Sequence, residues 1–238
     1  MTEADRVVTF DLFSALVDSR TGASRALDRL GAIRGWRPTG GEIYADWDAR
    51  NKQAQRACDV WVPYEVLARA ALADTYAELE LEGDAADDLV EVLDTLHEWP
   101  LWPDVEETLP VLARRYRVGL LSNVDDELFL RTRAAPYVDP KLAMTSERLG
   151  VYKPDPRIYH RAQEHLGPMV HVATSARDVR GSLEAGIPVV RLRRPGHPLD
   201  PQGPRPTVEA DAMAQLEDLI PDAWSRDGQR PGRTAGDD

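Results

Sequence analysis

Cysteine, aromatic residues and positive charge are all scarce in this chain of 238 residues. The single cysteine, Cys58, excludes an internal disulfide and is typical of a protein from a reducing compartment. Lysine and arginine together number 29 against 41 acidic residues, so the formal net charge is −12. A nucleic acid or an anionic membrane surface requires a basic face on its partner. The charge balance therefore argues against both as partners.

Long apolar runs are also lacking. No stretch approaches the ~20 apolar residues of a membrane-spanning helix, and the acidic start, MTEADR, has no signal-peptide-like apolar segment. Hydrophobic residues nevertheless make up 42% of the chain, which is enough for a sizeable core. We therefore expect a cytoplasmic globular protein. An anionic small molecule could bind only where a few cations gather in one pocket.

Short apolar runs that are typical of buried strands recur along the chain, and each ends in a polar turn. They are Val7–Phe10, Val118–Leu121, Leu142–Met144, Val170–Ala173 and Val189–Leu192. Most are followed by a helical pattern, and this alternation favours a parallel sheet that is covered on both faces. We predict an α/β fold with a Rossmann-like, doubly wound parallel sheet.

The segment 19–99 differs, because it shows only helical periodicity and contains no strand-like run. We interpret it as a helical cap inserted into a core that is formed by residues 1–18 and 100–224. The last segment, 225–238, has almost no apolar residue and is predicted to be disordered.

Polar residues stand where the predicted strands end or where a loop leads into a helix. Ligands of doubly wound sheets bind beyond the carboxyl ends of the strands, so these side chains should meet in one crevice. They are Asp11, Ser122, Asn123, Lys153, Thr174, Ser175 and Asp178.

Each of these residues, taken alone, allows more than one interpretation. Asp11 follows an apolar run and could be a nucleophile, a metal ligand or a helix cap. Lys153 could be a solvated surface lysine, and Ser122 with Asn123 could be turn residues. Asp178 could simply cap a helix.

The order of the motifs adds a resemblance to a known family. The chain from Val7 to about Leu219 resembles the haloacid dehalogenase (HAD) superfamily in four segments: FDLFSALVD at 10–18, LLSN at 120–123, VYKPD at 151–155 and the segment that ends in Asp178. The resemblance implies a Rossmann-like core with a helical cap at 19–99. Superfamily membership determines the fold better than the reaction.

Phe13 indicates which branch of the superfamily the chain resembles. Phosphatases of this superfamily carry a second aspartate two residues after the nucleophile, whereas the dehalogenase branch carries an aromatic residue there, as this chain does. The segments WPD at 102–104 and KPDPRIY at 153–159 are also similar to 2-haloacid and fluoroacetate-type dehalogenases.

The resemblance implies a metal-independent reaction without a cofactor, on a small anionic substrate. Asp11 would attack the carbon that bears the halogen, and water would hydrolyse the resulting ester. Lys153 would keep the pKa of Asp11 low, and Asp178 would place Lys153 and the water. Ser122, with backbone amides after Asp11, would hold the substrate carboxylate, and Asn123 with a cap arginine would meet the halide. The resemblance also suggests a homodimer.

The halide arginine depends on the alignment of the segment ADWDARNKQAQR. Matching RNKQ selects Arg50, whereas matching Trp47 places Asp48 at the same position. We predict Arg50, because a carboxylate would repel both halide and substrate; the alternative is an arginine on an exposed helix face.

Two departures from the family pattern concern hydrogen bonds. Ser14 and Ala15 replace the usual Gly-Thr, so a threonine hydroxyl is missing. Ser175 stands where the family often has asparagine three residues before the last aspartate, and it has one donor where the amide has two.

Other functions stay open at this point. A Mg²⁺-dependent phosphatase would use Asp11 and Asp178 as ligands. A hydrolase of another strained 2-substituted acid, or a protein that binds a carboxylate without turnover, would also fit the pattern.

Overall fold

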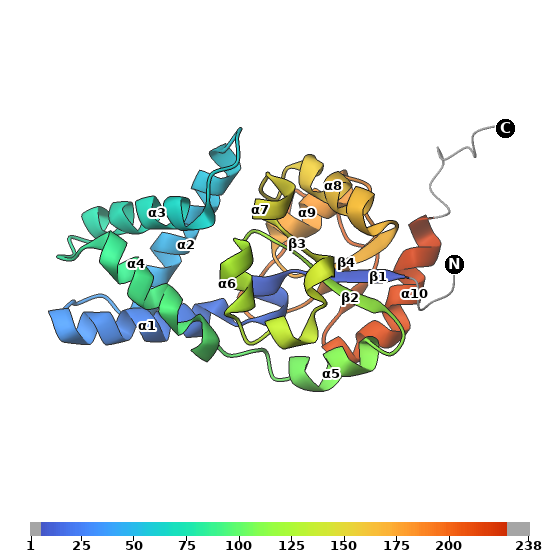
Figure 1. The fold of residues 1–238 in the computed structure, drawn as a ribbon, viewed down its shortest axis with the longest axis horizontal. Coiled ribbons are helices and arrows are strands. Elements are labelled where there is room, and N and C mark those ends of the chain that lie inside the picture. The colour runs from blue at the N-terminus through green and yellow to red at the C-terminus, as the bar shows by residue number, and fades with distance from the viewer. Residues whose placement is uncertain (1–5, 228–238) are drawn as a thin grey trace.

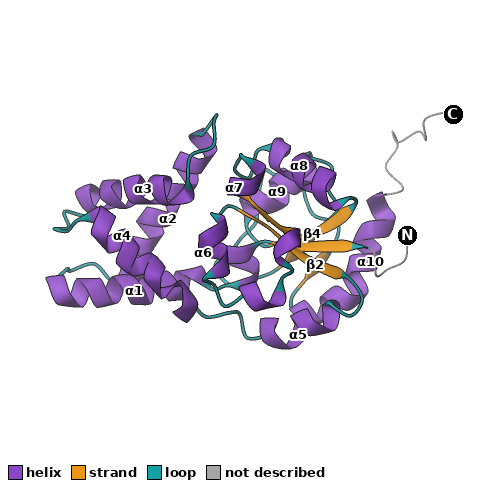
Figure 2. Cartoon of the chain, in the orientation of Figure 1, coloured by secondary structure: helices purple, strands orange, loops and turns teal. Residues whose placement is uncertain are grey.

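A parallel sheet forms the centre of the computed structural model, which describes residues 6–227 (Figures 1 and 2). The six strands lie in the order β3-β2-β1-β4-β5-β6, and every neighbouring pair is parallel. Their bounds are β1 Val7–Phe10, β2 Arg117–Ser122, β3 Ala143–Thr145, β4 Met169–Ala173, β5 Val189–Leu192 and β6 Glu209–Ala210. The predicted α/β fold with a doubly wound parallel sheet is confirmed.

Helices cover both faces of the sheet, which explains why the central strands β1 and β4 are buried along their whole length. Val8 and Phe10 of β1 pack in one cluster with α5 and α10, and Val7 packs in another with α8. Figure 1 shows α8 and α9 over one face and α5 beside the other. The helices of this part are α5 Val105–Leu112, α6 Asp126–Leu130, α7 Ser146–Leu149, α8 Pro156–Leu166, α9 Ala176–Glu184 and α10 Leu216–Asp227.

Between β1 and β2 the chain leaves the sheet and forms a helical insertion, residues 19–98 (Figure 1). Its helices are α1 Ser19–Arg34, α2 Gly40–Ala57, α3 Tyr64–Glu78 and α4 Ala85–Asp94, followed by a 3₁₀ turn at Thr95–Glu98. A capping box of Thr39 and Glu42 starts α2. No helix among residues 6–227 is long and apolar enough to cross a lipid bilayer.

The structure differs from the sequence prediction at the C-terminal end. The edge strand β6 is only two residues long and has no apolar run to reveal it. Helix α10 continues to Asp227, three residues into the segment 225–238 that we predicted to be disordered, and 228–238 lie outside the described residues. The division into a core, 1–18 with 100–224, and a cap, 19–99, stays a prediction.

The carboxyl end of β1 is the position in this fold where a ligand-binding site is expected. Phe10 lies beside Leu120 of β2 on one side and Val172 of β4 on the other, and Asp11 follows it immediately. The order β3-β2-β1-β4 makes this the point at which the chain switches direction across the sheet, and such points bind ligands.

Candidate active site

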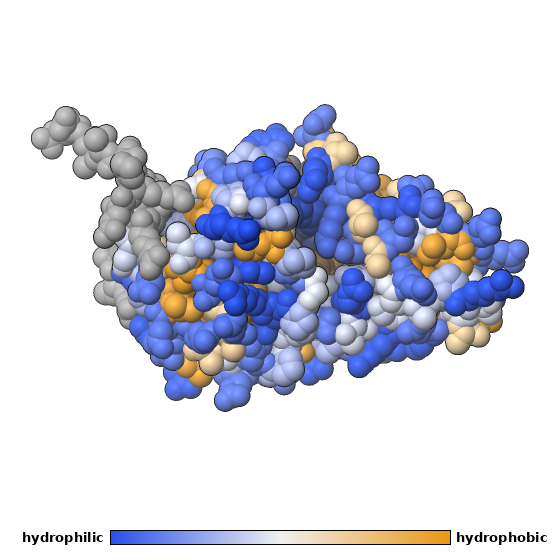
Figure 3. Space-filling model, turned by 180° about the vertical axis from the view of Figure 1, so that it is seen from behind, coloured by the Kyte–Doolittle hydropathy of each residue, from blue (hydrophilic) through white to orange (hydrophobic). Residues whose placement is uncertain are grey.

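A pocket lies between the carboxyl end of the sheet and the helical insertion, and Figure 3 shows the surface hollowed where these two parts meet. The turn after β1, the ends of β2 and β4, helix α2 and the β5–β6 connection all contribute to its wall. Of the predicted site residues, the following line it: Asp11, Ser122, Asn123, Lys153, Ser175 and Asp178.

Asp11 lies at the floor of the pocket with its carboxylate held on both oxygens. Its Oδ1 accepts hydrogen bonds from Lys153 Nζ at 2.8 Å and from Ser122 Oγ at 3.0 Å, and its Oδ2 accepts a short one from Ser14 Oγ. Burial and the charge of Asp178 would raise the pKa of Asp11, but the Lys153 ammonium and the hydrogen bonds from Lys153 and Ser14 outweigh them and hold the pKa below its ordinary value. Asp11 is therefore ionised at neutral pH.

Ser14 supplies a hydroxyl that the sequence suggested was missing. The family pattern would place a threonine hydroxyl at the position of Ala15, whose side chain here is buried and apolar. The π-helical turn Leu12–Leu16 brings Ser14 back onto the carboxylate of Asp11.

Lys153 is buried and bridges two carboxylates. Its ammonium donates to Asp11, to Asp178 Oδ2 at 2.6 Å and to the carbonyl of Leu121 at 2.8 Å, so all three of its donors are used. Only 3% of its side chain is exposed, which excludes a solvated surface lysine.

Asp178 is buried behind Lys153, and each of its oxygens has a partner. Its Oδ2 is also 3.0 Å from His171 Nε2, and its Oδ1 accepts from Tyr159 at 2.8 Å. Burial would raise the pKa of Asp178, but Lys153 and His171 lower it well below its ordinary value. Ser175 caps α9, where its hydroxyl accepts a hydrogen bond from the Asp178 backbone.

Asn123 connects the Lys153 loop to helix α2 through its side-chain amide. Its Nδ2 donates to Gln55 Oε1 at 2.9 Å and to the carbonyl of Lys153 at 3.0 Å, and its Oδ1 accepts from the Lys153 amide at 2.7 Å. Both of its donors are thus engaged, so it holds the Lys153 loop and links the core to α2.

The structure does not bring Arg50 to the pocket, and the placement predicted for it is wrong. Its guanidinium pairs instead with Asp46, one turn earlier in α2, and with Glu78 of α3. The reason is the phase of α2, whose pocket side repeats at helical spacing: Tyr44, Trp47, Asp48, Asn51, Lys52 and Gln55. The alternative alignment, which matches Trp47, selects Asp48, and Asp48 does line the pocket.

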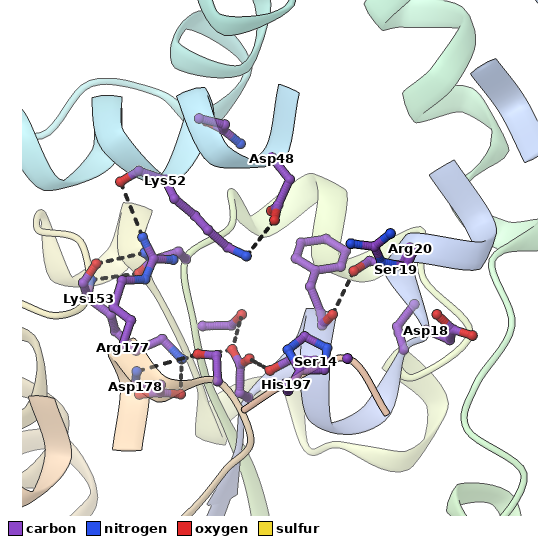
Figure 4. Close-up of a pocket in the computed structure, with 18 of the residues that line it drawn as sticks. Ser14, Asp18, Ser19, Arg20, Asp48, Lys52, Lys153, Arg177, Asp178 and His197 are labelled. Carbon is purple, nitrogen blue, oxygen red and sulfur yellow. Dashed lines mark hydrogen bonds and ion pairs between the residues drawn. The ribbon is translucent and has the colours of Figure 1, made fainter. Parts of the chain in front are cut away.

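Four basic residues that sequence reasoning missed line the pocket: Arg20, Lys52, Arg177 and His197 (Figure 4). Lys52 pairs with Asp48 one turn earlier in α2. Arg177 donates only long hydrogen bonds, at 3.3 Å to Gln55 Oε1 and 3.4 Å to the carbonyl of Lys52. Burial lowers the pKa of Arg177, while the charges of Asp11 and Asp178 oppose that shift.

Aromatic side chains form the apolar part of the wall. Phe13 lies 6.4 Å from the ring of Tyr64 and 5.9 Å from that of Trp99, measured between centroids. Trp47 of α2 and Trp102, which follows the insertion, also line the pocket. These side chains give the pocket an apolar wall beside the charged groups at its floor.

The two carboxylates that a phosphatase would use for Mg²⁺, Asp11 and Asp178, are both bound by the Lys153 ammonium. Within the described range 6–227, no group of three or more His, Cys, Asp or Glu side chains is arranged to hold a metal ion. The buried cation of this site is a lysine.

Comparison with known proteins relates the sequence to one family of hydrolases. The family model of the haloacid dehalogenase-like hydrolases matches residues 6–186. The (S)-2-haloacid dehalogenase 4A of Burkholderia cepacia is 31% identical over 232 residues, which span 92% of this chain and 96% of that protein. The (S)-2-haloacid dehalogenase of Pseudomonas sp. strain YL is 26% identical over 227 residues, which span 90% and 93%.

Solved structures share the fold. The defluorinating L-2-haloacid dehalogenase has a TM-score of 0.77 at 24% identity and covers 90% of this chain and 95% of its own. The L-2-haloacid dehalogenase from Xanthobacter autotrophicus with chloropropionic acid covalently bound has a TM-score of 0.76 at 22% identity, with coverage of 93% and 99%.

Proposed function

This chain belongs to the haloacid dehalogenase-like hydrolases, and on that basis we propose that it hydrolyses the carbon–halogen bond of a small (S)-2-halocarboxylic acid. The observation that carries the proposal is the state of Asp11, an ionised carboxylate held by Lys153 at the floor of a pocket lined by aromatic and cationic side chains. A carboxylate in this state can act as a nucleophile on carbon.

The first half of the reaction forms an ester. An oxygen of Asp11 attacks the carbon that bears the halogen, and the halide leaves with the bonding electrons. The Ser122 hydroxyl, which donates to Asp11 in the free protein, then donates to the substrate carboxylate. Backbone amides of the turn Leu12–Leu16 bind the same carboxylate. In the second half, water attacks the carboxyl carbon of the Asp11 ester and releases the 2-hydroxy acid.

Phe13 favours this reaction over phosphate transfer. It stands where phosphatases of the superfamily place the aspartate that protonates the leaving oxygen, and a phenyl ring has no proton to give. A halide needs none, because it leaves as a stable anion. The helical insertion would act as the cap that closes over the substrate.

Halide release is the direct test. We expect the purified protein to release halide from (S)-2-chloropropionate in the presence of EDTA, and to release little from the (R) enantiomer, as measured by ion chromatography. Chloroacetate and fluoroacetate complete the series. If no halide is released from any of them and phosphate esters are hydrolysed in the presence of Mg²⁺, the proposal is overturned in favour of a phosphatase. If neither reaction occurs, a binding protein is favoured.

We further propose that Arg177 accepts the departing halide in place of the predicted Arg50. It is a half-buried guanidinium whose hydrogen bonds are long, so most of its five donors are available to an anion. Replacing it, in Arg177→Gln, is expected to reduce kcat/KM for halide release about 10²–10³-fold, because charge that develops on the leaving atom loses its stabilisation.

Arg50→Gln is the matched control for this variant. Its ion pairs lie at the surface of the insertion, so its loss should leave kcat/KM close to the wild-type value and change stability little. If Arg50→Gln were the slower variant, the assignment of the halide contact to Arg177 would be wrong.

A further inference from the structure

His197 is a titratable group on the pocket wall that has no place in the mechanism above. It lies in the connection between β5 and β6, where Gly196 and His197 both line the pocket. Figure 4 shows its ring among the pocket-lining side chains, on the same side as Ser14. No hydrogen bond or ion pair occupies its ring within residues 6–227, so its nitrogens are available to a water or a ligand.

The connection that carries His197 is fastened to the turn that follows Asp11. Arg194 donates to the carbonyl of Ala15 at 3.0 Å and pairs with Asp104 at 2.8 Å. Arg191 donates to the carbonyl of His197 at 3.0 Å. The position of His197 relative to Asp11 is therefore set by buried contacts of its own loop.

The environment of His197 favours the neutral imidazole. Burial lowers the pKa of His197 below its ordinary value of 6.5, and the charge of Lys52 acts in the same direction. Asp11 and Asp48 oppose this shift, and Arg20 supports it. A neutral imidazole is a proton acceptor at neutral pH.

The second half of the reaction requires such an acceptor, and the other candidates are occupied. Asp178 has partners on both oxygens, and its lowered pKa makes it a weak base. Ser175, at the position where the family often has asparagine, uses its hydroxyl to cap α9. His171 is fully buried and bound between Thr9 and Asp178, so it does not reach the pocket.

We propose that His197 is the general base that activates the water for hydrolysis of the Asp11 ester. The inference rests on the function proposed above and extends it to a residue of the β5–β6 connection. The water oxygen bonds to the carboxyl carbon of Asp11 while its proton passes to the imidazole. The bond between that carbon and the ester oxygen then breaks, and the 2-hydroxy acid leaves with the proton from the imidazolium. Asp11, which keeps the second proton of the water, releases it to solvent and is again a carboxylate.

The test separates the two half-reactions in His197→Gln, which keeps a polar side chain but removes the base. With (S)-2-chloropropionate in rapid-quench experiments, we expect one halide per protein at the wild-type rate, followed by steady-state turnover that is about 10²–10⁴-fold slower. The ester should accumulate as a mass increase on the peptide that contains Asp11. Imidazole added to His197→Ala should restore steady-state turnover, which a purely structural role would not allow.

His160→Gln is the control, because His160 lies outside the pocket and bonds only the carbonyl of Ala185. A wild-type protein that releases halide, with a His197→Gln variant that shows neither a burst nor an ester, would overturn the inference and leave the proposed function intact. Equal slowing of both half-reactions without rescue by imidazole would also overturn it. A wild-type protein that releases no halide would instead remove the proposed function, and the inference with it.

Discussion

Asp11→Asn is expected to abolish halide release, with a loss of at least about 10⁴-fold in kcat, which is the scale seen when a nucleophile is removed. Asparagine has nearly the same shape as aspartate, but its amide is neutral and is a poor nucleophile on carbon. The variant keeps an oxygen to accept hydrogen bonds from Lys153 and Ser122, so the fold should be preserved. Ion chromatography of halide, with thermal unfolding as a check on folding, measures both effects.

Asp18→Asn is the matched control. Asp18 also lines the pocket, but its carboxylate caps α1 through the amide and hydroxyl of Thr21, and asparagine can cap equally well. Most of the wild-type rate should remain in this variant. If Asp11→Asn kept a rate close to that of Asp18→Asn, Asp11 would not be the nucleophile.

The lowered pKa of Asp11 determines the acid limit of ester formation, which is measured as the halide burst. The ionised form attacks, so the burst should persist as pH falls until it reaches the pKa of Asp11, which lies below the ordinary 3.8. Steady-state turnover also requires the neutral imidazole of His197, so its acid limb follows whichever of the two groups has the higher pKa. Loss of the burst well above pH 3.8, in a protein that is still folded, would mean that another group controls ester formation.

The sequence predicted those parts of the site that follow buried strands. Asp11 and Ser122 are found at strand ends because continuous apolar runs mark the strands, and parallel strands end at one edge. Lys153 and Asp178 could be placed only through the order of the motifs, because a lysine before proline or an acid in a helix has no distinctive pattern of its own.

The parts that the sequence did not predict depend on helix phase and on tertiary contacts. Whether Arg50 or Asp48 faces the pocket is decided by Trp47, whose indole donates to the carbonyl of Ala68 in α3 and so fixes the rotation of α2. His197 lines the same pocket as Asp11, and Arg194 joins its loop to Ala15, about 180 residues away in the chain. Neither contact has a local signature in the sequence.

Lys153→Met is expected to reduce both stability and activity strongly, because Lys153 neutralises two buried carboxylates. The variant leaves Asp11 and Asp178 facing each other without a cation, and removing one partner of a buried ion pair costs about 3–5 kcal/mol. Burial and mutual repulsion then raise the pKa of at least one carboxyl group. A protonated Asp11 cannot attack, so kcat/KM for halide release should fall by about 10³-fold or more at neutral pH.

The pH dependence of unfolding distinguishes this explanation from simple loss of packing. In the wild type, the lowered pKa values of Asp11 and Asp178 contribute stability that is present above their unfolded value of 3.8 and is lost as pH falls through the folded values. In Lys153→Met a raised folded pKa reverses the sign, so acidification neutralises a buried charge and favours the folded state. The difference in Tm between the two proteins should therefore be largest at pH 7–8 and narrow towards about pH 5.

Lys52→Met is the control for the loss of a pocket lysine. Its ammonium pairs with Asp48 while 42% of its side chain is exposed, so its removal should change the free energy of unfolding by about 1 kcal/mol or less. That difference should hardly vary with pH, because water can solvate Asp48 where it cannot reach Asp178. A Tm gap for Lys153→Met that was equally insensitive to pH would show that Lys153 acts by filling space, and that the charge of Asp11 is maintained by other groups.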